Sequence, residues 1–181
     1  MIGEGAIFAE ICRLYIFLFL ALAALGKTKN VEQFRDNLVM SFYVPQWGSL
    51  WLALAVIGAE WLLAIGMAIS GQITYFATLG SAVLFTVFTI VIGVALLQKR
   101  MISCNCFGSE NKKLSKYDLL RNFSILGAIF FLLSCNPVLD FHLLTFILAI
   151  PFALILFQVS MNLDLIYVVM KGQSPVAASD D

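Results

Sequence analysis

Five stretches of this sequence are apolar and long enough to cross a lipid bilayer, and this feature limits the fold more than any other. They cover residues 6–26, 46–70, 74–98, 117–136 and 140–167, of which the last can end earlier. A transmembrane helix needs about 20 mostly apolar residues, whereas the strands of a membrane barrel alternate polar and apolar residues over about ten positions. The sequence therefore predicts an all-α integral membrane protein with a bundle of about five transmembrane helices, and at least four.

The composition supports this assignment. Hydrophobic residues make up 61% of the 181 residues and charged residues 12%, whereas a soluble domain has about 45–50% and about 25%. Disorder is excluded for the same reason. Eleven Lys and Arg balance eleven Asp and Glu, so the basic excess of a nucleic-acid-binding protein is missing. We expect residues 1–181 to form a single transmembrane domain that contacts the lipid bilayer and binds no nucleic acid.

Two connections between the spans are polar. Residues 27–43 place Val31, Phe34, Leu38 and Phe42 at roughly helical spacing, which predicts a short interfacial helix after the first span. The second polar connection covers residues 98–116. The first span itself is expected to be a retained helix, because the sequence before it lacks the basic residues of a signal peptide.

The basic residues are concentrated at one end of the predicted spans. Ten of the eleven cations lie at that end, including Lys27, and only Arg13 lies elsewhere. Cytoplasmic loops carry an excess of Lys and Arg. We therefore expect a multi-pass protein of a bacterial inner membrane, with the N-terminus outside, the C-terminus inside and both polar connections in the cytoplasm.

A pair of cysteines in the second polar connection is the main candidate for chemistry. Cys104 and Cys106 lie in the sequence Cys-Asn-Cys-Phe-Gly, which continues through Phe107 to Gly108. A disulfide between residues this close is expected to be strained, and strain raises the reduction potential. Nearby lysines and arginines favour the reactive thiolate. Redox chemistry, inert buried thiols and binding of a soft metal ion all remain open from the residues alone.

The other two cysteines, Cys12 and Cys135, are predicted at the opposite end of the bundle. Most cysteines at such depths are packing residues. Their shared depth also allows a second thiol pair that exchanges electrons with a partner on the far side of the membrane.

Charged groups inside the spans are costly and are therefore functional candidates. Glu10 and Arg13 lie on one face of the first helix, where they can pair with each other or with another helix. Glu60 lies near the middle of the second span without a neighbour of opposite charge, so it needs a partner such as Arg13 or a proton. Arg121 and Asn122 begin the fourth helix, where Arg121 can anchor at the interface or stabilise a thiolate of the cysteine motif.

These features together resemble the MauE/DoxX-like family of redox-associated membrane proteins. The most specific similarity is the Cys104–Gly108 motif, which resembles the family's C-G-C-F-G with Asn105 in place of Gly, followed by Leu-Leu-Arg-Asn at 119–122. Weaker similarities are Arg13, Leu25-Gly26-Lys27, Phe34, Val44-Pro45 and Glu60.

The resemblance implies a helical membrane protein that supports thiol–disulfide chemistry, in the manner of a protein that helps to mature a disulfide-rich periplasmic enzyme subunit. It also implies a partner that is thioredoxin-like or another membrane or periplasmic protein. The basic residues, however, place Cys104 and Cys106 at the cytoplasmic face, where thiols are kept reduced. Either the motif is reached from the far side, or it passes electrons across the membrane, or the orientation is reversed.

The resulting hypothesis is a thiol–disulfide oxidoreductase or redox accessory protein in which Cys104, Cys106 and Arg121 carry the chemistry. Phe107, Gly108 and Asn122 would support the motif, and Glu10, Arg13 and Glu60 would organise the bundle or handle protons. A quinone is a candidate electron carrier because it dissolves in the bilayer. The alternatives are a structural or accessory subunit of a larger membrane complex without catalysis, and handling of a soft metal ion by the cysteine pair.

Overall fold

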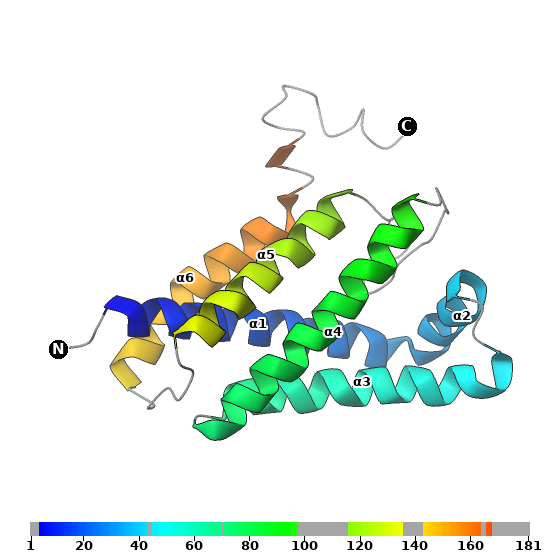
Figure 1. Ribbon diagram of the computed structural model, residues 1–181, viewed down its shortest axis with the longest axis horizontal. Coiled ribbons are helices and arrows are strands. Elements are labelled where there is room, and N and C mark those ends of the chain that lie inside the picture. Colours follow the sequence, from blue (N-terminus) through cyan, green and yellow to red (C-terminus); the bar gives the residue numbers. More distant parts are fainter. Residues whose placement is uncertain are drawn as a thin grey trace.

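A computed structural model of the protein describes residues 4–42, 45–69, 71–97, 116–135, 143–163 and 166–167. Over these residues the chain is helical and contains no strand. Figure 1 shows the helices in chain order. They are α1 (Glu4–Lys29), α2 (Val31–Phe42), α3 (Gln46–Ala68), α4 (Gln72–Leu97), α5 (Lys116–Ser134) and α6 (Leu143–Met161).

Five of these helices, α1 and α3 to α6, are long and apolar enough to cross a membrane. Helices suit this environment because every backbone N–H and C=O inside lipid must find its partner within the protein. The prediction of an all-α multi-pass membrane protein is therefore confirmed. The short helix expected after the first span is also present, as α2, and it packs against α3.

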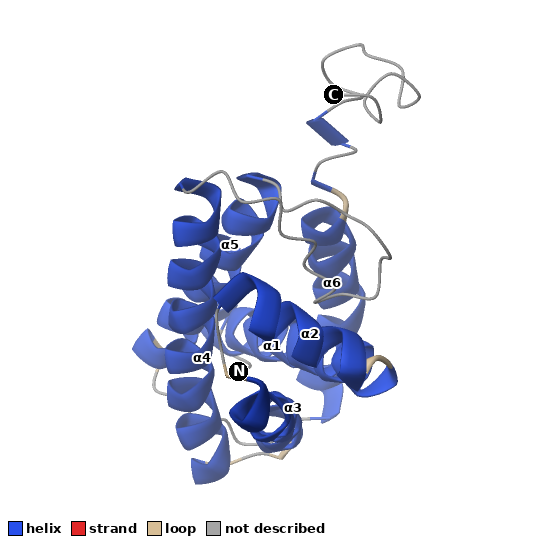
Figure 2. Cartoon of the chain, turned by 90° about the vertical axis from the view of Figure 1, so that its right-hand side faces the viewer, coloured by secondary structure: helices blue, strands red, loops and turns tan. Residues whose placement is uncertain are grey.

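The helix α1 lies at the centre of the bundle. It packs against α3, α5 and α6, and it is the most buried of the five spans. In Figure 1, α1 and α3 run side by side in opposite directions, and α4 lies beside α5. Figure 2 shows α1 between α4 and α5 on the left and α6 on the right. The main core cluster includes Ile16, Phe19, Leu20, Met67, Ile125 and Leu132.

A tight turn joins α3 to α4. Gly71 has a φ of 96°, a conformation that glycine adopts at little cost because it has no Cβ. The Thr74 hydroxyl donates a 2.5 Å hydrogen bond to the carbonyl of Ile69 and so closes the turn. Close packing continues into the helices, because a Cβ added at Gly66 would lie 2.8 Å from the Cβ of Ala77.

Five antiparallel spans divide the ends of the helices into two groups. At one end, α1, α4 and α6 end and α3 and α5 begin; α2 lies there, so we name it the α2 end. At the opposite end, α1 and α6 begin, α3 turns into α4, and α5 ends. The candidate residues fall into groups at or between these two ends.

Candidate functional site

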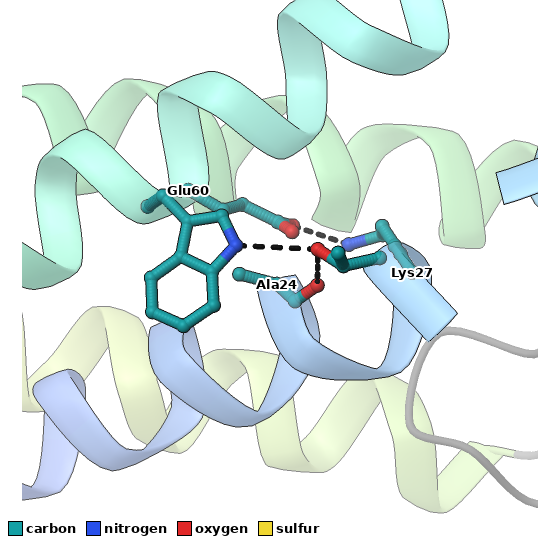
Figure 3. Close-up of polar contacts among 5 residues, drawn as sticks. Ala24, Lys27 and Glu60 are labelled. Carbon is teal, nitrogen blue, oxygen red and sulfur yellow. Dashed lines mark hydrogen bonds and ion pairs between the residues drawn. The ribbon is translucent and has the colours of Figure 1, made fainter. Parts of the chain in front are cut away.

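A buried ion pair joins the first two transmembrane helices. Lys27, in the last turn of α1, donates from its ammonium to the carboxylate oxygen Oε1 of Glu60 on α3. Figure 3 shows the two side chains pointing toward each other between the helices. Each side chain is only 1% exposed. A buried charge is costly unless it is paired and hydrogen-bonded, so each of these residues requires the other.

Two further helices contribute aromatic rings to this pair. The Lys27 ammonium lies 5.4 Å from the ring centroid of Phe34 on α2 and 5.0 Å from that of Phe88 on α4. A cation over an aromatic face is attracted by the negative charge of the ring. The ammonium therefore lies where α1, α2, α3 and α4 meet, and we call Lys27, Glu60, Phe34 and Phe88 the four-helix junction.

Hydrogen bonds next to the junction hold α1 against α3. The indole Nε1 of Trp61 donates to the Thr28 hydroxyl at 3.2 Å, and this hydroxyl donates to the carbonyl of Ala24 at 2.7 Å. Figure 3 shows these bonds beside the ion pair. Because Thr28 and Trp61 follow Lys27 and Glu60 directly in the sequence, the two contacts fix the same register between the helices.

The second carboxylate oxygen of Glu60, Oε2, has no hydrogen-bond partner among the described residues. A buried acceptor without a partner carries a desolvation cost of about 1–3 kcal/mol, and more for a charged group. This oxygen can therefore hold a proton or accept a hydrogen bond from a further donor. The ion pair can hold α1 against α3, and its Oε2 atom can still accept a hydrogen bond.

The sequence left open whether Glu60 binds a cation such as Arg13 or a proton, and the structure gives it a cation from another position on α1. The guanidinium of Arg13 instead binds Glu10, one turn earlier on α1, with an N–O distance of 2.5 Å. Of the two alternatives for Glu10 and Arg13, the structure shows the pairing of these residues with each other, and this pair is buried. The partner of Glu60 is Lys27, which the sequence analysis placed in a polar connection facing the cytoplasm.

Helical periodicity contains the signal that places Lys27 in the interior. Ile16, Leu20 and Ala23 are buried at intervals of four and three along α1. A further step of four reaches Lys27, so this lysine continues the core-facing stripe. An acidic residue in mid-span without a local partner, together with a lysine on such a stripe, would have predicted the pair.

The residues that follow the cysteine motif form a polar group at the α2 end. Arg121, in the second turn of α5, makes a 3.0 Å ion pair with Asp118 and is largely buried. Asn122 beside it is 3% exposed, and its Nδ2 has no hydrogen-bond partner in the described part of the chain. Cys104, Cys106, Phe107 and Gly108 lie outside the described residues, so contact of Arg121 with a thiolate stays a prediction.

Three hydroxyl groups connect α1, α5 and α6. The Tyr15 hydroxyl lies 2.7 Å from the Ser160 hydroxyl and 3.1 Å from that of Ser124. This group cannot be recognised in the sequence, because its members are far apart in the chain and none of them is unusual on its own. It joins the central helix to the two helices that follow the cysteine motif.

The remaining two cysteines lie on α1 and at the end of α5. Both are free thiols; Cys12 is partly buried and Cys135 is exposed. The helices that carry them, α1 and α5, pack against each other. A second thiol pair formed by these two residues stays a prediction.

This fold, with five candidate spans of which α1 is central and with ion pairs buried inside the bundle, defines a multi-pass helical membrane protein. A family model described as "Methylamine utilisation protein MauE" matches residues 5–135. The chain belongs to this family, as the sequence motifs suggested. No curated protein and no solved structure gives a significant match.

Proposed function

We propose that the protein is a membrane thiol–disulfide redox protein that assists disulfide formation or maturation in partner proteins. Cys104 and Cys106 are its redox pair. The observation that carries this proposal is that the family match, residues 5–135, includes both cysteines together with the Arg121 side chain that follows them. The name of the family refers to methylamine utilisation, and we expect the partner to be an exported protein of that system.

The redox step is an exchange between two pairs of sulfur atoms. A thiolate of the partner attacks the Cys104–Cys106 disulfide, which forms a mixed disulfide and releases one cysteine thiolate. The second thiolate of the partner then attacks the partner's sulfur in the mixed disulfide and releases the other cysteine thiolate. The partner gains a disulfide, and Cys104 and Cys106 take up the two electrons and two protons. A lipid-soluble quinone, reduced to a quinol by the same two electrons and protons, would return the pair to its oxidised form.

Arg121 is a described cation that follows this pair in the chain. It lies near the start of α5, the helix that follows the motif, and Asp118 holds its guanidinium on that helix. A cation near a thiol favours the thiolate, which is the reacting species. We therefore assign Arg121 a positioning role and expect Asn122 to support the motif from the same turn.

Complementation tests the proposal. Cells that lack the gene would carry the wild type, Cys104→Ser, Cys106→Ser or the matched control Ser103→Ala, and the disulfide state of the exported methylamine-utilisation proteins would be measured by alkylation and mass spectrometry. We expect loss of disulfides with either cysteine variant and wild-type behaviour with the control. Full disulfide formation with both cysteine variants would contradict the proposal and favour a structural subunit.

A second experiment tests the role of Arg121. The rate of alkylation of Cys104 and Cys106 would be measured against pH in a Cys12→Ser, Cys135→Ser background. We expect Arg121→Gln to shift the profile to higher pH, because the thiolate loses a stabilising cation. Arg121→Lys, which keeps the positive charge, should leave the profile close to that of the wild type. An unchanged profile in Arg121→Gln would exclude this role.

A further inference from the structure

The two cysteines outside the motif lie beside one core cluster. On α1, Cys12 falls in a row with Ala9, Ile16 and Phe19, at intervals of three and four residues. These three neighbours are buried in the main core cluster, and Cys12 packs against it. Cys12 therefore lies on the face of α1 that packs against the core.

Cys135 occupies the corresponding position on α5. Ile125, Ile129 and Leu132 form the buried stripe of this helix, at intervals of four and three, and belong to the same cluster. One more step of three reaches Cys135, whose backbone N–H still bonds to the carbonyl of Phe131 as in a helix. Because α1 and α5 pack against each other, the two stripes bring both cysteines to one junction of helices.

Cys135 directly follows α5, whereas the cysteine motif precedes this helix in the sequence. The 19 residues of α5 correspond to about 28 Å at 1.5 Å per residue, which is close to the thickness of the hydrocarbon core. We therefore assign the Cys12–Cys135 pair a partner of its own, at the end of the bundle where α5 ends.

We infer that Cys12 and Cys135 form a second, reversible dithiol–disulfide site, which exchanges with a disulfide-bearing protein domain at the opposite end from the motif. This inference extends the proposed function but does not need Cys104 or Cys106. The exposure of the two thiols assigns their order of reaction. Cys135 is exposed and meets the partner, and Cys12 is partly buried and resolves the intermediate.

Each step of the exchange balances. The Cys135 thiolate attacks a sulfur of the partner's disulfide, which forms a mixed disulfide and releases one partner thiolate. The Cys12 thiolate then attacks the Cys135 sulfur and displaces the second partner thiolate. The site ends as a disulfide, and the partner ends as a dithiol with two more electrons and, after protonation, two more protons. The reverse sequence oxidises a dithiol partner.

The test uses full-length protein in lipid nanodiscs with Cys104→Ser and Cys106→Ser, so that failure of the motif cannot affect the result. Glutathione disulfide is the probe, and intact-mass spectrometry is the readout. We expect the protein to lose two hydrogens without retaining glutathione. Adding Cys12→Ser should leave one stable glutathione adduct, on Cys135, because the resolving thiol is gone. Adding Cys135→Ser should abolish the rapid reaction.

A matched variant separates a specific pair from two accessible thiols. Cys135→Ser combined with Ser134→Cys moves the thiol by one residue, which turns it about 100° around the helix and off the stripe. We expect a glutathione adduct and no disulfide in this variant. Independent adducts on Cys12 and Cys135, or two thiols that remain reduced at every ratio of glutathione disulfide to glutathione, would overturn the inference.

Discussion

The ammonium of Lys27 and the carboxylate of Glu60 meet in the interior of the bundle, although Lys27 lies in the last turn of α1 and Glu60 lies well inside α3. Loss of either partner leaves the other as an uncompensated buried charge. Such losses cost about 3–5 kcal/mol, whereas replacement of both partners by apolar groups is often neutral or stabilising. The relationship between these two residues therefore predicts a specific pattern among variants.

We expect Lys27→Met and Glu60→Leu each to lower the free energy of unfolding by about 3–5 kcal/mol. The double variant should recover most of this loss. Thermal unfolding in one detergent would compare all three variants with the wild type. The control is Arg35→Gln, because Arg35 pairs with Asp36 on the exposed side of α2. Exposed pairs contribute about 0–1 kcal/mol. Additive losses in the double variant would show that the two charges do not depend on each other.

The contact between α3 and α4 allows a comparison among glycines. A Cβ at Gly66 would meet the Cβ of Ala77 at 2.8 Å, and neither atom can rotate away. At Gly80 the obstacle is the end of the Leu63 side chain at 2.6 Å, which can adopt another rotamer. We expect Gly66→Ala to destabilise the protein by about 1–3 kcal/mol and Gly80→Ala to cost less.

The control for this series is Gly93→Ala, since a Cβ there meets no atom within 4 Å. Its helix gains the higher helical propensity of alanine, so its unfolding temperature should be unchanged or slightly raised. Equal losses at Gly66 and Gly93 would mean that close approach of α3 to α4 does not determine stability.

The number and type of the transmembrane helices followed from the sequence, because lipid leaves the backbone almost no other solution. The amphipathic helix α2 and the local Glu10–Arg13 pair were also predictable, since helical spacing determines both. Partners on different helices were harder to predict. The sequence identified Glu60 as a group in need of a partner, but its pairing with Lys27 depends on how α1 and α3 are placed beside each other.

Lys27 shows why the pattern of basic residues alone does not identify which lysine side chains are buried. Counting basic residues by side of the membrane treats each lysine as a loop residue, although a long side chain near a helix end can turn inward when a buried carboxylate attracts it. The same limitation applies to Tyr15, whose partners Ser124 and Ser160 come from α5 and α6. Periodicity identifies the buried face of each helix, but it does not identify which faces meet.

The hydroxyl group of Tyr15 bridges two helices, and its removal should have a small, measurable cost. Hydrogen bonds between membrane helices average about 0.6 kcal/mol and reach about 1.7 kcal/mol. We expect Tyr15→Phe to destabilise the protein within this range. A double-mutant cycle with Ser160→Ala, which removes the partner at 2.7 Å, should yield a coupling energy of similar size. A coupling of zero would mean that the contact contributes nothing to the association of α1 with α6.

The orientation proposed from the basic residues can be tested with the cysteines themselves. Variants that keep only Cys135 or only Cys106 would be treated in intact cells with a maleimide that does not cross the inner membrane. We expect Cys135 to be labelled and Cys106 to be protected until the cells are lysed, because the basic residues predict that the connection with Cys106 is cytoplasmic and α5, which leads to Cys135, is long enough to cross the hydrocarbon core. Labelling of Cys106 alone would reverse the orientation and place the motif in the oxidising compartment. Labelling of both would show that the motif is reached from the far side.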